Sequence, residues 1–249
     1  MSVLKLPSVI GHRGAAAYAP ENTLESIRTA AEIGTKWVEL DVKLTKDGIP
    51  IIFHDDTLER TTSGYGLVAD TNYDDIKELE AGLWFSEGFT GVIVPTLEEA
   101  MEVILHHDLG VNFEIKPCPG REVETAEVML DILSQGWDDT SKLLISSFQH
   151  VSLEVALDMV PDFHRGLLLE DEWPENWKEL ADYLQVSSIN FNGNAANREQ
   201  VEELIELQKP VCAYTINDIQ TAKRLRQWGV DAFFTDDPEA VNDSLFRSH

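Results

Sequence analysis

Three acidic side chains in this sequence have a spacing that suits a metal site. Glu39 and Asp41 are two residues apart in an apolar segment, so in a strand both carboxylates point to the same face. Glu114 stands in the same relation to Lys116 in a later segment. Burying three carboxylates together is opposed by desolvation and like-charge repulsion unless a cation joins them. Oxygen ligands without cysteine are typical of a hard cation, so these three residues are candidate ligands of Mg²⁺ or Ca²⁺.

Nearby cations and histidines favour this site over the simpler alternative, in which the carboxylates are solvated or paired with Lys and Arg. Arg13 and Lys116 are two of only 19 basic residues in a chain with 45 acidic ones. Together with a metal ion they would form a local positive pocket suited to a phosphate group. His12 and His54 end neighbouring apolar segments, where a general acid and a general base for phosphoryl transfer would be needed.

Alternating strands and helices are required to bring these residues together. Apolar segments of strand length recur with helical stretches between them, and Gly34, Gly110 and Gly229 each stand between a helical pattern and the next strand. This alternation over about 250 residues favours a (β/α)8 TIM barrel, whose active site lies at the carboxyl ends of the strands. A doubly wound sheet is the alternative, but no Gly-rich dinucleotide motif follows the first segment. The expected strands are residues 9–12, 37–45, 50–54, 111–116, 143–148, 166–169, 188–192, 211–216 and 232–235.

Capping patterns mark where helices begin. Asn22, Thr96 and Asn197 each stand three residues before Glu or Gln, which is the arrangement of a capping box. We therefore expect a helix to start directly after each of them. For Glu21 and Asn22, a place in the site is an equally open interpretation.

The sequence has nine expected strands, one more than a (β/α)8 barrel needs, and a hairpin explains the extra one. Asp47-Gly48 between two apolar segments is a strong hairpin signal. With a two-residue turn, Asp41 would lie opposite His54 in the paired strands. This register is a prediction, and it would place a histidine beside the acidic end of the second strand.

Residues 55–95 interrupt the alternation of strands and helices. The stretch contains several glycines and aromatic residues, among them Trp84 and Phe85. A connection of this length in a compact domain is usually functional or a small subdomain. We expect a lid over the barrel mouth that supplies aromatic walls to the substrate pocket, and the alternative is an excursion with a hydrophobic core of its own. The chain is thus predicted to be one domain, residues 1–249, with an insertion at 55–95.

The charge balance excludes several classes of partner. The 249 residues carry a formal net charge of −26, with a pI near 4.4. A negative field of this size repels nucleic acid and anionic membranes, and no apolar run is long enough to cross a bilayer. We expect a small-molecule substrate and a monomer or homodimer. Residues 1–7 lack a long apolar stretch, and Cys118 and Cys212 cannot form a disulfide framework, so a cytoplasmic setting is expected.

Short motifs surround the candidate residues. They are His12-Arg13-Gly14, Ala19-Pro20-Glu21-Asn22-Thr23, Glu39-Leu40-Asp41-Val42, Thr45-Lys46-Asp47-Gly48, His54-Asp55 and Glu114-Ile115-Lys116-Pro117. Their order and spacing resemble the signature series of the glycerophosphodiester phosphodiesterase family, and the chain is most similar to its cytoplasmic bacterial members. The resemblance extends over nearly the whole chain, and its motifs are specific in combination.

The resemblance implies a TIM barrel that hydrolyses glycerophosphodiesters to sn-glycerol 3-phosphate and an alcohol with a divalent cation. Matching of positions implies the metal ligands Glu39, Asp41 and Glu114, the acid–base pair His12 and His54, and the phosphate contacts Arg13 and Lys116. Two other functions stay open. One is a phosphodiesterase of the same fold that acts on lipid, such as a lysophospholipase D or a phosphoinositide-type phospholipase. The other is a non-catalytic phosphodiester-binding protein, although binding alone needs no pair of histidines.

Overall fold

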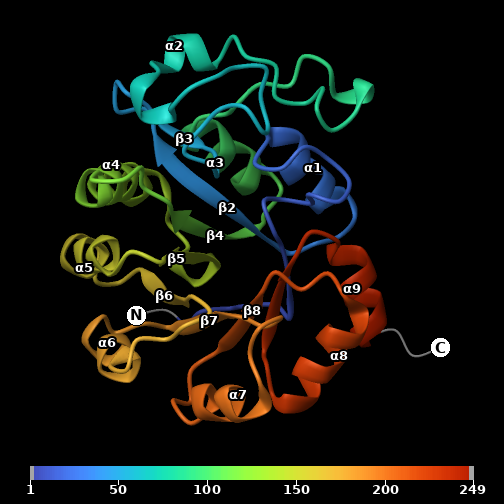
Figure 1. The fold of residues 1–249 in the computed structure, drawn as a ribbon, viewed down its shortest axis with the longest axis vertical. Helices are drawn as coiled ribbons and strands as arrows, with labels where there is room; N and C mark the ends of the chain where they lie inside the picture. Colours follow the sequence, from blue (N-terminus) through green and yellow to red (C-terminus); the bar gives the residue numbers. More distant parts are fainter. Residues whose placement is uncertain (1–2, 247–249) are drawn as a thin grey trace.

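Nine strands form one sheet in the computed structural model, which describes residues 3–246 (Figure 1). They are β1 (Val9–Gly11), β2 (Trp37–Leu44), β3 (Pro50–Ile52), β4 (Gly110–Ile115), β5 (Leu143–Ser147), β6 (His164–Leu169), β7 (Ser188–Asn192), β8 (Val211–Tyr214) and β9 (Ala232–Thr235). All except β3 run parallel, and a contact of Gly11 in β1 with Val38 in β2 closes the ring. The predicted (β/α)8 TIM barrel is confirmed, and the predicted strand bounds differ from these by two residues or fewer.

Helices surround the barrel on the outside, and most of them connect consecutive parallel strands (Figure 1). They are α1 (Leu24–Glu32), α2 (Tyr73–Ile76), α3 (Leu97–His106), α4 (Glu122–Gly136), α5 (His150–Met159), α6 (Trp177–Tyr183), α7 (Arg198–Ile205), α8 (Ile219–Trp228) and α9 (Pro238–Phe246), with 3₁₀ turns at Val68–Asp70, Glu87–Phe89 and Thr140–Lys142. Within the described residues, none of these helices has the length and apolar character needed to cross a membrane.

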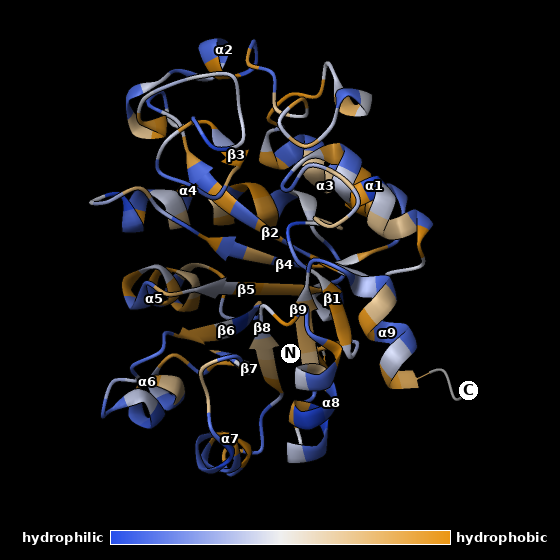
Figure 2. Cartoon of the chain, turned by 45° about the vertical axis from the view of Figure 1, so that its right-hand side comes forward, coloured by the Kyte–Doolittle hydropathy of each residue, from blue (hydrophilic) through white to orange (hydrophobic). Residues whose placement is uncertain are grey.

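The strands separate an inner core from an outer one. Phe233 and Phe234 are neighbours in β9, yet Phe233 packs in the cluster between strands and helices, whereas Phe234 packs with Ile10, Trp37 and Leu144 from three other strands. This is the alternation expected of a strand with both faces buried. Figure 2 shows the consequence, because β1 and β5 are largely hydrophobic while β2 and β4 include hydrophilic residues. The barrel is therefore a packed core, and its buried carboxylates lie on β2 and β4.

The hairpin of β2 and β3 is present, but its predicted register was wrong. Val42 pairs with Ile52, and the N–H of Phe53 donates to the carbonyl of Asp41, so Asp41 lies opposite Phe53 and not His54. The connection is a three-residue loop that ends on Gly48, whose φ is 80°. A turn followed by a left-handed glycine is the usual geometry of such a loop, and it moves the register by one residue.

Two of the three predicted capping boxes are confirmed, at Thr96 for α3 and at Asn197 for α7. The third prediction was wrong, because Thr23 and not Asn22 caps α1, with Ser26 as its partner. An N-cap needs an extended backbone, and Asn22 instead has a φ of 57°. The side chain of Asn22 is thereby released for another contact.

The glycine pattern holds at two of its three positions. Gly34 and Gly229 follow their helices with φ values of 86° and 104°. Gly110 instead begins β4, and the left-handed residue after α3 is Asp108, with a φ of 55°. A side chain at Gly110 would collide with the indole of Trp37, so this glycine is required by close packing between β2 and β4.

The insertion, residues 55–95, lies beside the barrel around α2, at the top of Figure 1. It has a hydrophobic cluster of its own, in which Leu58, Val68, Ile76 and Val94 pack against Ile51 of β3. The small hydrophobic core named in the alternative expectation is therefore present, and a lid over the barrel mouth stays a prediction. That core fixes the insertion to β3 and hence to the edge of the barrel.

Candidate active site

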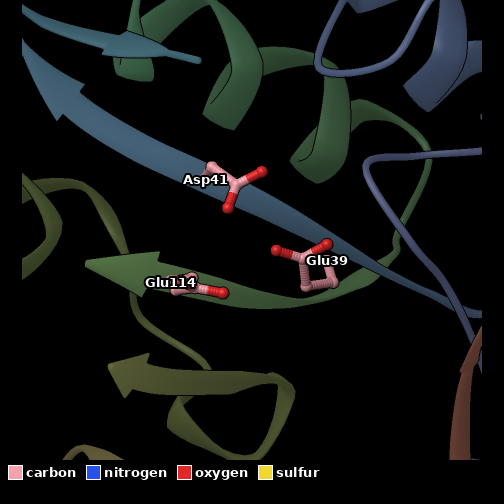
Figure 3. Close-up of side chains that lie close together, drawn as sticks. All are labelled: Glu39, Asp41 and Glu114. Carbon is pink, nitrogen blue, oxygen red and sulfur yellow. The ribbon is translucent and has the colours of Figure 1, made fainter. Parts of the chain in front are cut away.

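Strand register brings the three predicted carboxylates together near the carboxyl ends of β2 and β4. Asp41 pairs directly with Glu114, and Glu39 precedes Asp41 by two positions and so faces the same side. All three side chains are buried, and one oxygen from each lies within 4.8 Å of the others. Figure 3 shows the three carboxylates converging between the two strands.

Burial and proximity disfavour three full negative charges in this cluster. Burial, with the charges of Asp41 and Glu114, raises the pKa of Glu39 well above its usual value. Burial and Asp41 raise the pKa of Glu114 to about 7. Burial also opposes the ionisation of Asp41, but the charges of Arg13 and Lys116 outweigh it and lower the pKa of Asp41 to about 2. Ionisation of Asp41 is thus favoured by its cationic neighbours, whereas ionisation of Glu39 and of Glu114 is opposed by burial and by the other carboxylates.

The donor set fits a hard divalent cation. Glu39 Oε1 is buried and has no hydrogen-bond partner among the described residues, which is a costly state for a carboxylate oxygen. The other oxygen of Glu39 accepts the backbone N–H of Arg13 at 2.9 Å. Asp41 Oδ2 accepts a hydrogen bond from Asn22 Nδ2 at 2.8 Å. A cation bound among these oxygens would satisfy Oε1 and offset the mutual repulsion of the carboxylates.

The turn after β1 carries the first cation of the site. Arg13 has a φ of 51°, a left-handed conformation that is uncommon outside glycine and that occurs at functional sites. The turn continues through Gly14, where φ is 90° and any side chain would collide with Ser26. This backbone directs Arg13 to the carboxylates, with Nη1 at 2.6 Å from Glu21 Oε1 and Nε at 3.4 Å from Asp41 Oδ2.

The second cation follows β4. Lys116 Nζ donates to Glu114 Oε1 at 2.8 Å and lies 3.8 Å from Asp41 Oδ1. The ammonium also lies 5.5 Å from the centre of the Phe148 ring, within range of a cation–π interaction. Burial opposes the charged form, but Glu114 and Asp41 overcome this and raise the pKa of Lys116. The ammonium therefore stays charged beside the acidic cluster.

Each candidate histidine is oriented by a carboxylate. His12 Nδ1 lies 2.7 Å from Asp236 Oδ1, and its Nε2 lies 3.8 Å from Glu39 Oε2. His54 Nδ1 lies 2.6 Å from Asp55 Oδ1. A carboxylate at Nδ1 favours the tautomer with the proton there, which leaves Nε2 as the acceptor in the neutral ring. Burial lowers the pKa of His54, so its neutral form is favoured at pH 7.

One cavity of about 320 Å³ at the mouth of the barrel is lined by all seven residues predicted for the site. The remainder of its wall is mostly apolar and aromatic. That wall consists of Asn112, Phe148, Leu168, Tyr214, Thr215 and Phe234. The structure therefore gathers every predicted site residue around one space, together with several apolar and aromatic side chains.

Sequence reasoning left open or missed the residues that support these groups. Asn22 is bound to Asp41 twice, because its Oδ1 also accepts the backbone N–H of Asp41 at 3.2 Å. The left-handed Asn22 therefore belongs to the site and not to a helix cap. Asp55 was signalled by its position next to His54, whereas Asp236 is more than 200 residues from its partner His12 and no local pattern marks it.

Comparison with known proteins extends this description. Residues 12–240 match the glycerophosphoryl diester phosphodiesterase family. The chain belongs to this family. A glycerophosphodiester phosphodiesterase of Caldanaerobacter subterraneus subsp. tengcongensis is 36% identical over 242 residues, which cover 94% of this chain and 95% of that protein. The family expected from the sequence motifs, and with it the enzyme class, is thus confirmed.

Solved structures of similar phosphodiesterases have the same fold. A phosphodiesterase of Oleispira antarctica, in complex with the product sn-glycerol-3-phosphate, has a TM-score of 0.92 and 40% identity, with 96% of this chain and 97% of that chain covered. A glycerophosphodiester phosphodiesterase of Thermotoga maritima has a TM-score of 0.75 and 27% identity, with 95% and 97% covered. The family match begins at His12 and so includes all seven residues of the predicted site.

Proposed function

We propose that this protein hydrolyses glycerophosphodiesters to sn-glycerol 3-phosphate and an alcohol at the barrel mouth. The observation that carries the proposal is the convergence of three carboxylates, two histidines and two cations on one cavity. The cavity has the size of a small-molecule site. The Oleispira antarctica relative, whose complex contains sn-glycerol-3-phosphate as product, supports the same substrate class.

In this proposal Glu39, Asp41 and Glu114 hold a divalent cation, Mg²⁺ or Ca²⁺. Once bound, such a cation acts as a Lewis acid on a phosphoryl oxygen. The chain contributes the fixed position of the carboxylates. Asn22 binds Asp41 by two hydrogen bonds, and the backbone N–H of Arg13 holds one oxygen of Glu39.

Arg13 and Lys116 bind the phosphate of the substrate. Both side chains line the cavity and both are charged, so they neutralise the phosphoryl oxygens as charge redistributes in the transition state. Glu21 occupies Nη1 of Arg13, which leaves Nη2 to donate to a phosphate oxygen. The fork of an arginine suits this task better than a single ammonium would.

His12 and His54 exchange the protons of the reaction. One imidazole starts neutral and takes a proton through Nε2 from the attacking water, while the other starts as the imidazolium and donates its Nε2 proton to the oxygen of the departing alcohol. A P–O bond to the water oxygen forms as the bond between phosphorus and the alcohol oxygen breaks, and the retained P–O bond to glycerol gives sn-glycerol 3-phosphate. Asp236 and Asp55 each hold Nδ1 of one ring, so that both Nε2 atoms are available for this exchange.

The insertion, residues 55–95, forms the wall against which the alcohol is bound. Trp84 and Phe85 line a hollow of about 420 Å³ that shares His12 and Arg13 with the catalytic cavity. The two rings meet edge to face with their centres 5.8 Å apart, which gives the hollow a firm aromatic side. The substitution Trp84→Ala should therefore raise KM for substrates with a large alcohol more than for those with a small one.

Phosphorus NMR of the products from glycerophosphocholine tests the proposed function. The expected result in the presence of Mg²⁺ or Ca²⁺ is a single phosphorus product, sn-glycerol 3-phosphate, together with choline. Phosphocholine and glycerol would instead show cleavage on the other side of the phosphorus. Cleavage of lysophosphatidylcholine alone would identify a lipid enzyme, and absence of any reaction from folded protein would contradict the proposal.

A further inference from the structure

Arg60, in the insertion, binds two carboxylates at once. Its Nη1 and Nη2 donate to Glu21 Oε2 and Oε1, both at 2.8 Å. Its Nε and Nη2 donate to Asp55 Oδ2 and Oδ1 at 2.6 and 2.8 Å. The guanidinium thus makes a two-bond fork with each partner, which is the strong, directional form of a charge-assisted hydrogen bond.

Each of these carboxylates also holds a residue of the catalytic cavity. Glu21 Oε1 accepts a hydrogen bond from Arg13 Nη1 at 2.6 Å, and Asp55 Oδ1 lies 2.6 Å from His54 Nδ1. The two carboxylates come from separate parts of the fold, because Glu21 lies between β1 and α1 whereas Asp55 follows β3. Arg60 joins them, and a continuous series of contacts runs from Arg13 to His54.

The charges of this series support one another. An exposed ion pair contributes little to stability, and Arg60 is itself 45% exposed, but the side chains of its partners Glu21 and Asp55 are only 12% and 24% exposed. Burial opposes the ionised form of Glu21, yet hydrogen bonds and charges from Arg60 and Arg13 lower its pKa. Hydrogen bonds from Arg60 lower the pKa of Asp55 far below its usual value. Both carboxylates stay charged at neutral pH and keep their contacts to the cavity residues.

We propose that Arg60 is a positioning residue, which fixes Arg13 and His54 relative to each other through Glu21 and Asp55. This inference rests on the proposed function, in which Arg13 binds the phosphate and His54 transfers a proton. The two groups act on the same phosphorus, so their separation must match the transition state, and a misplacement of about 1 Å lowers a rate by about 10²-fold. A lysine cannot replace Arg60, because a single ammonium does not form two forks.

The variants Arg60→Ala and Arg60→Lys test this inference in the assay of glycerophosphocholine hydrolysis with Mg²⁺. Arg60→Ala should lower kcat/KM by about 10–10²-fold, with KM raised through Arg13 and kcat lowered through His54. Arg60→Lys should retain most of this defect although it keeps the charge. Guanidinium ion, added to Arg60→Ala far below denaturing concentrations, should restore part of kcat.

A double-mutant cycle tests specifically whether Arg60 connects Glu21 to Asp55. Glu21→Gln and Asp55→Asn should be non-additive when Arg60 is present, because either one interrupts the same series of contacts. In the Arg60→Ala background their effects should add. Arg198→Ala is the matched control, since Arg198 forms an exposed pair with Glu202 on α7, and it should leave kcat and KM unchanged.

Two results would overturn the inference. One is an Arg60→Ala enzyme with kcat and KM within about twofold of the wild type, and the other is full activity in Arg60→Lys, which would reduce the role to charge alone. Should Arg60→Ala fail to fold, Arg60→Lys decides by the same criterion. The wild-type enzyme in the same assay separates the proposed function from the proposed role of Arg60, because inactivity of the wild type would contradict the function itself. Calorimetric binding of sn-glycerol 3-phosphate, which should weaken in Arg60→Lys, would then still test the contact to Arg13.

Discussion

The barrel buries charged side chains at both of its ends, and the two ends differ in whether the hydrogen bonds of those side chains are complete. Arg165, near the start of β6, is 1% exposed, and it makes five hydrogen bonds to backbone carbonyls, among them Nε to Leu184 at 2.9 Å and Nη1 to Phe163 at 2.8 Å. Leu184 and Val160, another acceptor, are the C-terminal caps of α6 and α5. The last carbonyls of a helix lack partners within the helix and carry partial negative charge, so they satisfy a guanidinium without any carboxylate.

The carboxyl ends of β2 and β4 show the opposite situation. Glu39, Asp41 and Glu114 repel one another, and Glu39 Oε1 has no hydrogen-bond partner among the described residues. A buried charge whose hydrogen bonds are complete leaves its partners unsatisfied when it is removed, whereas a buried carboxylate that lacks a partner is available to a ligand. The comparison therefore predicts that substitutions at the carboxyl ends of the strands lower activity, whereas substitution of Arg165 at the other end lowers stability.

The largest effect is expected from the histidines at the barrel mouth. His12→Ala or His54→Ala should lower kcat by about 10²–10⁴-fold, because in the proposed mechanism each removes a group that transfers a proton. Neither should lower the midpoint of urea unfolding appreciably, since both side chains are partly exposed. Steady-state kinetics and urea denaturation of each variant measure both quantities. Unchanged kcat in one variant would remove that histidine from the mechanism.

Arg165 should show the reverse behaviour. Arg165→Met leaves several buried carbonyls without a donor, so the free energy of unfolding should fall by about 3 kcal/mol. Protein that remains folded should keep its kcat. Urea denaturation with Arg198→Ala as an exposed control measures the difference. Loss of activity without loss of stability in Arg165→Met would contradict the difference that we expect between the two ends.

Removal of one clustered carboxylate should stabilise the metal-free protein. Burial and Asp41 raise the pKa of Glu114 to about 7, so its charged form is unfavourable in the fold. Glu114→Gln should therefore raise the free energy of unfolding in EDTA by about 1–3 kcal/mol and weaken stabilisation by added Mg²⁺. Thermal unfolding with and without Mg²⁺ measures both.

The matched control for Glu114 is Glu124→Gln. Glu124 is exposed and forms a fork with Arg121, which lowers its pKa, so loss of its charge should give no stabilisation. Equal responses of the two variants to EDTA and to Mg²⁺ would contradict the metal-ligand role of Glu114.

The smallest effect is expected at the start of α3, where the hydrogen bonds of the Thr96 side chain are complete and lie outside the candidate site. The Thr96 side chain accepts the N–H of Glu99 in a complete capping box. Thr96→Ala should lower the free energy of unfolding by about 1 kcal/mol and leave kcat unchanged. Lower activity in the fully folded variant would mean that completed hydrogen bonds do not mark a purely structural residue here.

The fold and most of the candidate site were predictable because strand geometry has a period of two. Glu39 and Asp41 must share a face in any strand, and a parallel barrel brings the end of β4, with Glu114, to the same rim. The hairpin register was not predictable from its turn, because Asp-Gly suits two loop lengths. Thr45 decides between them, since its Oγ1 donates to Asp47 Oδ1 and accepts the N–H of Ile49.

The supporting residues escaped prediction because their partners are distant in the sequence. Arg60 and Glu21 are 39 residues apart, and Asp236 and His12 are 224 apart. Asn22 was ambiguous for another reason, because asparagine is both a favoured cap and one of the few residues that adopt a left-handed backbone. Because the neighbouring Thr23 is the N-cap of α1, Asn22 takes the left-handed backbone instead of the cap position.

The release of sn-glycerol 3-phosphate from glycerophosphocholine by EDTA-stripped enzyme, with Mg²⁺ or Ca²⁺ added back, tests the central claim most directly. We predict no release without metal, restored release by the wild type, and restoration of Glu114→Gln only at higher metal concentration. Release that EDTA does not affect would contradict the assignment of the carboxylate cluster. Absence of release from folded protein with either metal would contradict the proposed reaction itself.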